Sequence, residues 1–137
     1  MSDVLLVEDN KDTRNVLVYL LKAAGHGVCA VDSIKLALQE ALLASYDVLI
    51  SDISLPDGDG WELMRELRTR GSTMRGIAMS GHCSARDIAK SLESGFQYHL
   101  FNTTLTSLSI STKLKRYCAP ISRLEQSMEN SQNSLWR

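Results

Sequence analysis

Three carboxylates stand at the ends of apolar runs that are typical of buried strands. Glu8 and Asp9 follow residues 4–7, and Asp52 follows residues 48–50 after a single serine. Because the carboxyl ends of parallel strands meet at one edge of a sheet, we expect the three side chains to converge. Carboxylates held together repel one another, and a hard divalent cation relieves that repulsion. The spacing therefore predicts a Mg²⁺ site made by these three residues.

A carboxylate in such a place can also act as a nucleophile and become an aspartyl phosphate. A cation beside Asp52 would neutralise the charge of an incoming phosphoryl group. Ser80 ends a strand predicted over residues 77–79, where its hydroxyl could bind a phosphoryl oxygen, and Gly81 leaves room for the substrate. The alternative is structural: Asp52 and Ser80 would cap turns, and the acidic pair at residues 8–9 would favour the next helix N-terminus.

Five short apolar runs alternate with four amphipathic segments, which predicts a parallel sheet with helices on both faces. Strands are expected at residues 4–7, 28–31, 48–50, 77–79 and 98–101. Helices are expected after N-caps at Asn10, Asp32 or Ser33, Asp59 and Ser84. Their inner faces are expected to carry, in helix order, Leu17, Leu20, Leu21 and Ala24; Ile34, Ala37, Leu38, Ala41, Leu42 and Ser45; Leu63, Met64 and Leu67; and Ile88, Ala89 and Leu92. Trp61 is expected to pack on the third helix or its loop.

Composition excludes several classes of protein. The 137 residues suit one domain, and 44% of them are hydrophobic, which is enough for a core. A net charge of -1 gives no reason to expect binding to nucleic acid or to an anionic membrane. No apolar run approaches the roughly 20 residues of a membrane helix, and no signal peptide is evident. The three separated cysteines predict free thiols in a reduced, cytoplasmic protein.

Four separated motifs carry a family resemblance. They are Leu5-Leu6-Val7-Glu8-Asp9-Asn10, the block at 47–60 with Leu55-Pro56-Asp57-Gly58, Ala78-Met79-Ser80-Gly81, and Gly95-Phe96. Over residues 3–101 the sequence resembles the receiver domain of two-component response regulators. Gly95-Phe96 with His99-Leu100 is similar to receivers at the ends of hybrid histidine kinases. The resemblance implies a flavodoxin-like, doubly wound sheet of five parallel strands in the order 2-1-3-4-5.

The resemblance also assigns roles to site residues. It implies that Asp52 is the phosphoacceptor, that Asp9, Asp52 and the backbone carbonyl of Ser54 bind Mg²⁺, and that Glu8 acts through water. Ser80 matches the hydroxyl that moves toward the phosphoryl group. His99 matches the aromatic switch position, with an ordinary half-buried strand residue as the alternative.

One departure from the family concerns the residues after the fifth strand. Where the family has Lys-Pro, this chain has Asn102-Thr103, so the phosphoryl group would lack one cationic partner. Residues 102–118 mix apolar residues with many serines and threonines, which predicts an irregular fifth helix. We expect a receiver domain at residues 1–118 and a flexible polar tail at 119–137.

We expect a signalling switch rather than an enzyme, phosphorylated by a histidine kinase or a histidine phosphotransfer protein. A downstream protein would bind through the fourth helix and fifth strand, and a homodimer is left open. The first alternative, motivated by Asn102, is a degenerate receiver that acts as an interaction module without phosphate. The second is a haloacid-dehalogenase-like phosphatase, which the residue at Ser54 disfavours, because that family has a second aspartate there.

Overall fold

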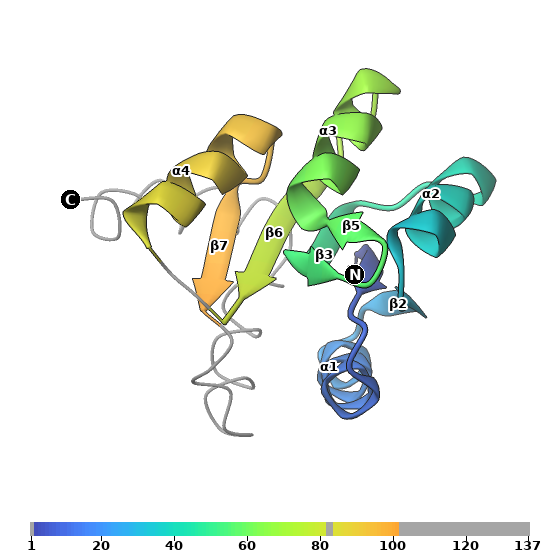
Figure 1. The fold of residues 1–137 in the computed structure, drawn as a ribbon. Coiled ribbons are helices and arrows are strands. Elements are labelled where there is room, and N and C mark those ends of the chain that lie inside the picture. Colours follow the sequence, from blue (N-terminus) through green and yellow to red (C-terminus); the bar gives the residue numbers. More distant parts are fainter. Residues whose placement is uncertain (1, 82–83, 102–137) are drawn as a thin grey trace.

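The computed structural model describes residues 2–81 and 84–101, in which strands and helices alternate (Figure 1). The main sheet contains β1 (Asp3–Val7), β2 (Gly27–Val31), β3 (Val48–Asp52), β6 (Arg75–Ser80) and β7 (Tyr98–Phe101). The helices are α1 (Lys11–Ala23), α2 (Ile34–Leu43), α3 (Gly60–Thr69) and α4 (Ala85–Ser94). Two short strands, β4 (Ser54–Leu55) and β5 (Gly58–Asp59), pair with each other in an antiparallel ribbon.

All neighbouring strands of the main sheet are parallel, in the order β2-β1-β3-β6-β7. Since β4 and β5 lie outside this sheet, β6 and β7 are the predicted fourth and fifth strands. The predicted order 2-1-3-4-5 and the flavodoxin-like fold class are therefore confirmed. The strand β3 lies at the centre, with β1 on one side and β6 on the other.

Helices cover both faces of the sheet: α2, α3 and α4 lie on one side and α1 on the other (Figure 1). Consecutive strand residues point to opposite faces, so Leu6 packs with Leu17 of α1 while Leu5 packs with Leu63 of α3. All four side chains are fully buried. Burial of each contributes about 1.5–3 kcal/mol, which explains why the strands consist of consecutive apolar residues.

Each described helix begins at a predicted capping residue. Asn10 Oδ1, Ser33 Oγ, Asp59 Oδ1 and Ser84 Oγ accept hydrogen bonds from backbone N–H groups at 3.0, 3.3, 2.8 and 3.1 Å, respectively. A cap of this kind stabilises a helix by about 1 kcal/mol. Among these residues, no helix has the length and hydrophobicity that are needed to cross a bilayer.

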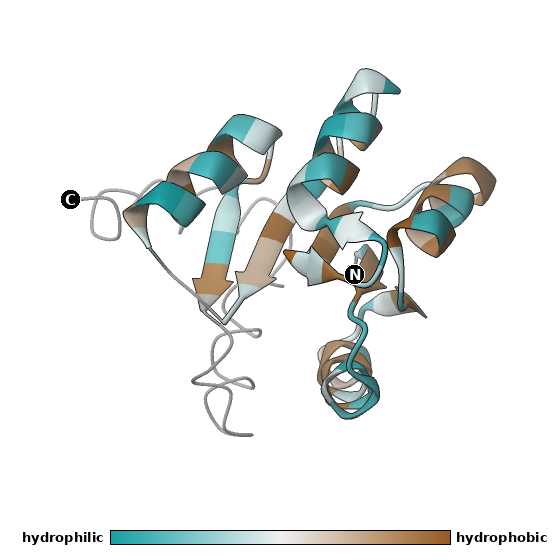
Figure 2. Ribbon diagram, in the orientation of Figure 1, coloured by the Kyte–Doolittle hydropathy of each residue, from teal (hydrophilic) through white to brown (hydrophobic). Residues whose placement is uncertain are grey.

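The predicted inner face of α4 is wrong at Ala89 and Leu92, whereas Ile88 is half-buried. Ala89 is exposed and Leu92 is 40% exposed, whereas Ser91 and Ser94 are buried. The reason is hydrogen bonding, because the two hydroxyls meet polar groups of α3: Trp61 Nε1 donates to Ser91 at 2.8 Å and Arg65 to Ser94 at 3.3 Å. In Figure 2, hydrophilic and hydrophobic segments alternate along the ribbons of α3 and α4.

The prediction for Leu42 is also wrong, since this side chain is 75% exposed at the C-terminal end of α2. The buried face of α2 is centred on Ala37. Leu42 follows Ala37 by five residues, which places it about 140° around the helix. The helix then ends at Leu43, so Ser45 lies beyond it and is exposed.

Candidate functional site

The structure brings Glu8, Asp9 and Asp52 together at the carboxyl edge of the sheet. β1 and β3 are adjacent and in register, with Val7 opposite Ser51, so the acidic residues that follow lie side by side. One carboxylate oxygen from each of the three residues lies within 4.8 Å of the others. This is a group of oxygen ligands that could hold a divalent cation.

Glu8 has an orphaned oxygen that fits such a cation. The residue is 3% exposed, and its Oε1 accepts a hydrogen bond from Asn10 N–H at 3.0 Å. Its Oε2 is buried and has no hydrogen-bond partner in the part of the chain that the structure describes. A buried carboxylate oxygen without a partner is costly, and a cation or its water shell would satisfy it.

The same cluster changes the acidity of Asp52. Burial of its carboxyl group, followed by the effects of Glu8 and then Asp9 beside it, raises the pKa of Asp52 from 3.8 to about 9. Without a cation the carboxyl group therefore holds a proton at neutral pH. A nucleophilic carboxylate must be ionised, so the site becomes reactive only when positive charge offsets this repulsion.

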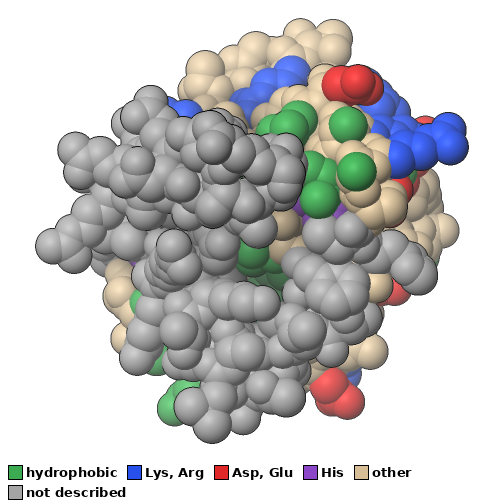
Figure 3. Space-filling view, turned by 90° about the vertical axis from the view of Figure 1, so that its left-hand side faces the viewer, with side chains coloured by type: hydrophobic (Ala, Val, Ile, Leu, Met, Phe, Trp, Pro, Cys, Tyr) green, Lys and Arg blue, Asp and Glu red, His purple; other side chains and the backbone are tan. Residues whose placement is uncertain are grey.

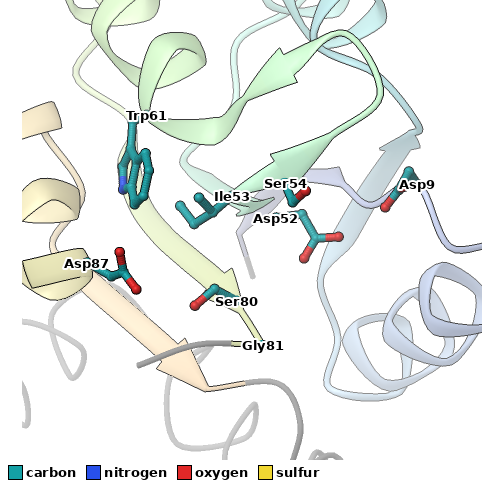
Figure 4. Close-up of a pocket in the computed structure, with 8 residues that line it drawn as sticks. All are labelled: Asp9, Asp52, Ile53, Ser54, Trp61, Ser80, Gly81 and Asp87. Atoms are coloured by element: carbon teal, nitrogen blue, oxygen red, sulfur yellow. The ribbon is translucent and has the colours of Figure 1, made fainter. Parts of the chain in front are cut away.

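A pocket of about 440 Å³ opens beside the cluster. Its lining consists of Asp9, Asp52, Ile53, Ser54, Trp61, Ser80, Gly81 and Asp87. In Figure 4, Asp52 and Ser80 project from the ends of β3 and β6, with Asp9 on one side and Trp61 and Asp87 on the other. The pocket thus places a carboxylate, a hydroxyl and the candidate cation ligands around one space.

His99 lies next to this pocket on β7, where it is opposite Ala78. Its Nε2 lies 2.7 Å from Ser80 Oγ, so the two residues proposed as switch elements are in hydrogen-bond contact. The fourth predicted phosphoryl-binding residue, Asn102, lies outside the described residues. The whole of the predicted irregular helix at 102–118 and the whole of the predicted tail also lie outside them.

Several residues near the site were missed by sequence reasoning. Trp61 was expected to pack locally, but it lines the pocket and reaches α4 through Ser91. Asp87 also lines the pocket, as the third residue of α4. Arg14 Nη1 donates to the backbone oxygen of Glu8 at 2.9 Å and so holds the turn that carries the acidic pair. No periodic pattern in the sequence indicates these contacts.

Comparison with known proteins identifies the fold and the family. The sequence profile described as "Response regulator receiver domain" matches residues 4–104. The chain belongs to this family. An uncharacterized 14.6 kDa protein of Leptolyngbya boryana is 30% identical to this receiver domain over 118 residues, covering 85% of this chain and 89% of that protein.

A further relative and a protein of similar fold are regulators by name. The transcriptional regulatory protein HprR of Escherichia coli is 32% identical over 125 residues, which are 89% of this chain. The receiver domain spans 56% of the length of HprR. The solved structure of the chemotaxis response regulator CheY4 of Vibrio cholerae has a TM-score of 0.75 and 24% identity, and the match covers 85% of this chain and 98% of that chain. This likeness supports the fold.

Gly60 allows α3 to begin directly behind the acidic cluster of the receiver domain. Its N–H donates to Ile53 O at 2.7 Å, and a Cβ atom here would press on the backbone carbonyl of Asp52. We expect Gly60→Ala to lower the free energy of unfolding by about 1–3 kcal/mol, because the contact is with backbone that cannot turn away. Urea denaturation measures this change.

The matched control is Gly27→Ala. Among the described residues, a Cβ atom at Gly27 meets only the side chain of Asp3, which is exposed and can rotate. If both variants lose the same stability, close packing behind Asp52 is not the reason for a glycine at position 60.

Proposed function

We propose that this receiver domain accepts a phosphoryl group on Asp52 from a histidine kinase or a histidine phosphotransfer protein. The observation that carries the proposal is the convergence of three acidic side chains within 4.8 Å at the carboxyl edge of the sheet. Ser80 lines the same pocket as Asp52 and Asp9, which supports a site that receives an anion beside a cation. On this proposal the protein is a signalling switch and not an enzyme for an external substrate.

The proposed transfer is a substitution at phosphorus. A carboxylate oxygen of Asp52 forms a bond to the phosphorus atom as the P–N bond to the donor imidazole breaks. The electron pair of that bond stays on the imidazole nitrogen, and the ring leaves neutral because its other nitrogen already carries a proton. Asp9, Asp52 and the backbone carbonyl of Ser54 would hold Mg²⁺, with Glu8 acting through water. When bound, the ion supplies positive charge that offsets the repulsion among the carboxylates and the phosphoryl group.

Ser80, the last residue of β6, and Gly81, which follows it, would complete the site. The hydroxyl of Ser80 is suited to bind a phosphoryl oxygen, and Gly81 lines the pocket without a side chain that would fill it. His99 contacts Ser80 at 2.7 Å, which supports a link from the phosphoryl group to β7. The proposed output surface is formed by α4 and β7.

The proposed output surface combines hydrophobic side chains with basic ones, which suits a protein partner. Leu92 is 40% exposed and Ile88 is half-buried. In Figure 3, which views the molecule from the α4 side, hydrophobic side chains lie beside basic ones. A protein partner, including a second copy of this chain, is the proposed ligand of this face, and the cytoplasm is the proposed location.

The proposal is tested by incubating the protein with acetyl phosphate and Mg²⁺ and measuring its intact mass. The expected result is the addition of one phosphoryl group, which hydroxylamine removes because an acyl phosphate is labile to it. Omission of Mg²⁺ is expected to suppress the addition. A protein that stays unmodified at high acetyl phosphate and Mg²⁺ would contradict phosphoacceptance.

The sequence at Asn102 favours a second candidate, an interaction module that works without phosphate. This residue stands where the family has a lysine, and an amide forms hydrogen bonds about half as strong as those of a charged donor. We expect Asn102→Lys to speed phosphorylation by acetyl phosphate by about tenfold, since it restores a contact worth about 1–2 kcal/mol. Rates are measured by intact mass at fixed times.

The control for side-chain length is Asn102→Gln, which adds no charge and should leave the rate close to that of the wild type. Equal rates in all three proteins would mean that the missing charge does not limit phosphorylation. The segment after Thr103 would then be the better explanation of a weak switch.

A further inference from the structure

A line of hydrogen-bond contacts joins four elements beside the proposed phosphorylation pocket. Trp61 of α3 contacts Ser91 of α4 at 2.8 Å, Ser91 contacts His99 of β7 at 2.8 Å, and His99 contacts Ser80 at the end of β6 at 2.7 Å. Lys90 Nζ lies 4.3 Å from the centroid of the Trp61 ring, which helps to hold the indole against α4. Phosphoacceptance on Asp52 does not by itself require the first two contacts.

The first contact in this line has only one possible direction. The indole Nε1–H of Trp61 is a donor and never an acceptor, so Ser91 Oγ accepts from it. Ser91 is 1% exposed, and a buried hydroxyl needs an acceptor for its own hydrogen. Ser94, the other buried serine of α4, donates to the carbonyl oxygen of Lys90 at 2.7 Å. For Ser91, the acceptor that the described residues place within reach is His99 Nδ1.

The direction at Ser91 determines the protonation of the imidazole. If Ser91 donates to Nδ1, that nitrogen carries the lone pair and the proton of the neutral ring is on Nε2. The opposite tautomer would direct two N–H groups at Ser91 Oγ and leave the Ser91 hydrogen with no acceptor among the described residues. The geometry therefore favours the Nε2–H form by about tenfold or more.

We propose that Ser91 and Trp61 are positioning residues that fix His99 as the Nε2–H tautomer, so that His99 donates to Ser80. This inference rests on the proposed function, because it concerns the hydroxyl that would bind the phosphoryl group. With His99 as donor, the hydrogen of Ser80 is not directed at the imidazole, and Ser80 lines the pocket that it shares with Asp52. A phosphoryl oxygen there would meet a hydroxyl donor, and an anionic oxygen requires a hydrogen-bond donor.

The line of contacts also gives α3 and α4 a role in the site. A displacement of α4 that breaks the contact from Ser91 to His99 would allow the imidazole to change tautomer and accept from Ser80 instead. The hydroxyl hydrogen of Ser80 would then turn away from the pocket. By reciprocity, an anion that binds Ser80 as an acceptor would stabilise the position of α4 in which Ser91 donates.

The test is the ¹⁵N NMR spectrum of the imidazole in the unphosphorylated full chain, labelled with ¹⁵N-histidine, at about pH 8, where histidine is neutral. His99→Gln identifies the His99 signals. The expected result is a protonated Nε2 and an unprotonated Nδ1 shifted by an accepted hydrogen bond. A protonated Nδ1 in the wild type would overturn the inference.

Two variants at position 91 distinguish the role of the Ser91 hydroxyl in fixing the tautomer of His99 from a role of Ser91 in packing alone. In Ser91→Ala the Nδ1 signal is expected to move toward that of an imine nitrogen without a hydrogen bond, and phosphorylation by acetyl phosphate is expected to slow. In Ser91→Thr, which keeps the hydroxyl, both properties should stay close to those of the wild type. An unchanged Nδ1 signal in Ser91→Ala would also overturn the inference.

Trp61→Phe keeps an aromatic ring and removes the N–H donor. It is expected to weaken the preference for the Nε2–H tautomer, since Ser91 can then reorient. The NMR measurement needs no phosphate, so it distinguishes this inference from the proposed function. Expected tautomers in a protein that acetyl phosphate never modifies would refute phosphoacceptance and leave the hydrogen-bond direction intact.

Discussion

Asp52→Asn is expected to reduce phosphorylation by acetyl phosphate by more than about a hundredfold, because an amide oxygen cannot replace a carboxylate as the attacking group. Asparagine has nearly the same shape as aspartate, so the pocket around position 52 is expected to persist. Intact-mass analysis measures the loss. Borohydride reduction followed by peptide mapping of the wild type locates the acyl phosphate.

The matched controls are Asp57→Asn and Asp59→Asn, which remove a carboxylate in the same way a few residues later. Asp57 accepts hydrogen bonds from the N–H groups of Ile34 and Lys35 at 2.9 and 3.0 Å, and the first of these in particular keeps the pKa of Asp57 below its ordinary value. Asp59 caps α3. Neither residue lines the pocket. Both variants should still be phosphorylated, and a label on either residue with none on Asp52 would refute the assignment.

Much of this fold can be predicted from local sequence, for a physical reason. Strands buried on both faces need consecutive apolar residues, and residues 4–7 and 48–50 have them. The acidic residues at the ends of these strands therefore lie at the shared carboxyl edge of the sheet. The convergence of Glu8, Asp9 and Asp52 is thus a consequence of topology, which the alternation of strands and helices already limits.

The orientation of α4 could not be predicted in this way. The rule that apolar residues face inward favoured Leu92, but the helix buries Ser91 instead. That choice depends on Trp61 and His99, which lie 30 residues before and 8 residues after Ser91 in the sequence. A buried polar contact between distant residues has no local pattern, so only the folded chain brings the partners together.

The stability of the protein without metal is expected to depend on pH in an unusual direction for a carboxylate. The pKa of Asp52 in the folded protein, about 9, lies above its ordinary value of 3.8, so the folded state binds this proton more tightly than the unfolded state does. The contribution of Asp52 to stability is therefore fully present below about pH 4 and is lost as pH rises through about 9. Near pH 8, Asp52→Asn should be more stable than the wild type, because the amide has no charged form that the fold must bury.

Mg²⁺ is expected to reverse this loss, because a cation bound by Glu8, Asp9 and Asp52 takes the place of the proton. At a concentration ten times its dissociation constant, Mg²⁺ should stabilise the wild type by about 1.4 kcal/mol near pH 8 and by much less near pH 5, where protons compete for the same oxygens. Thermal unfolding with Mg²⁺ and with EDTA at both pH values measures the effect. Asp9→Asn should abolish it, whereas Asp12→Asn, which removes an exposed carboxylate from the first turn of α1, should not. If Mg²⁺ stabilises Asp9→Asn as much as the wild type, the ion binds elsewhere and the acidic cluster is not its site.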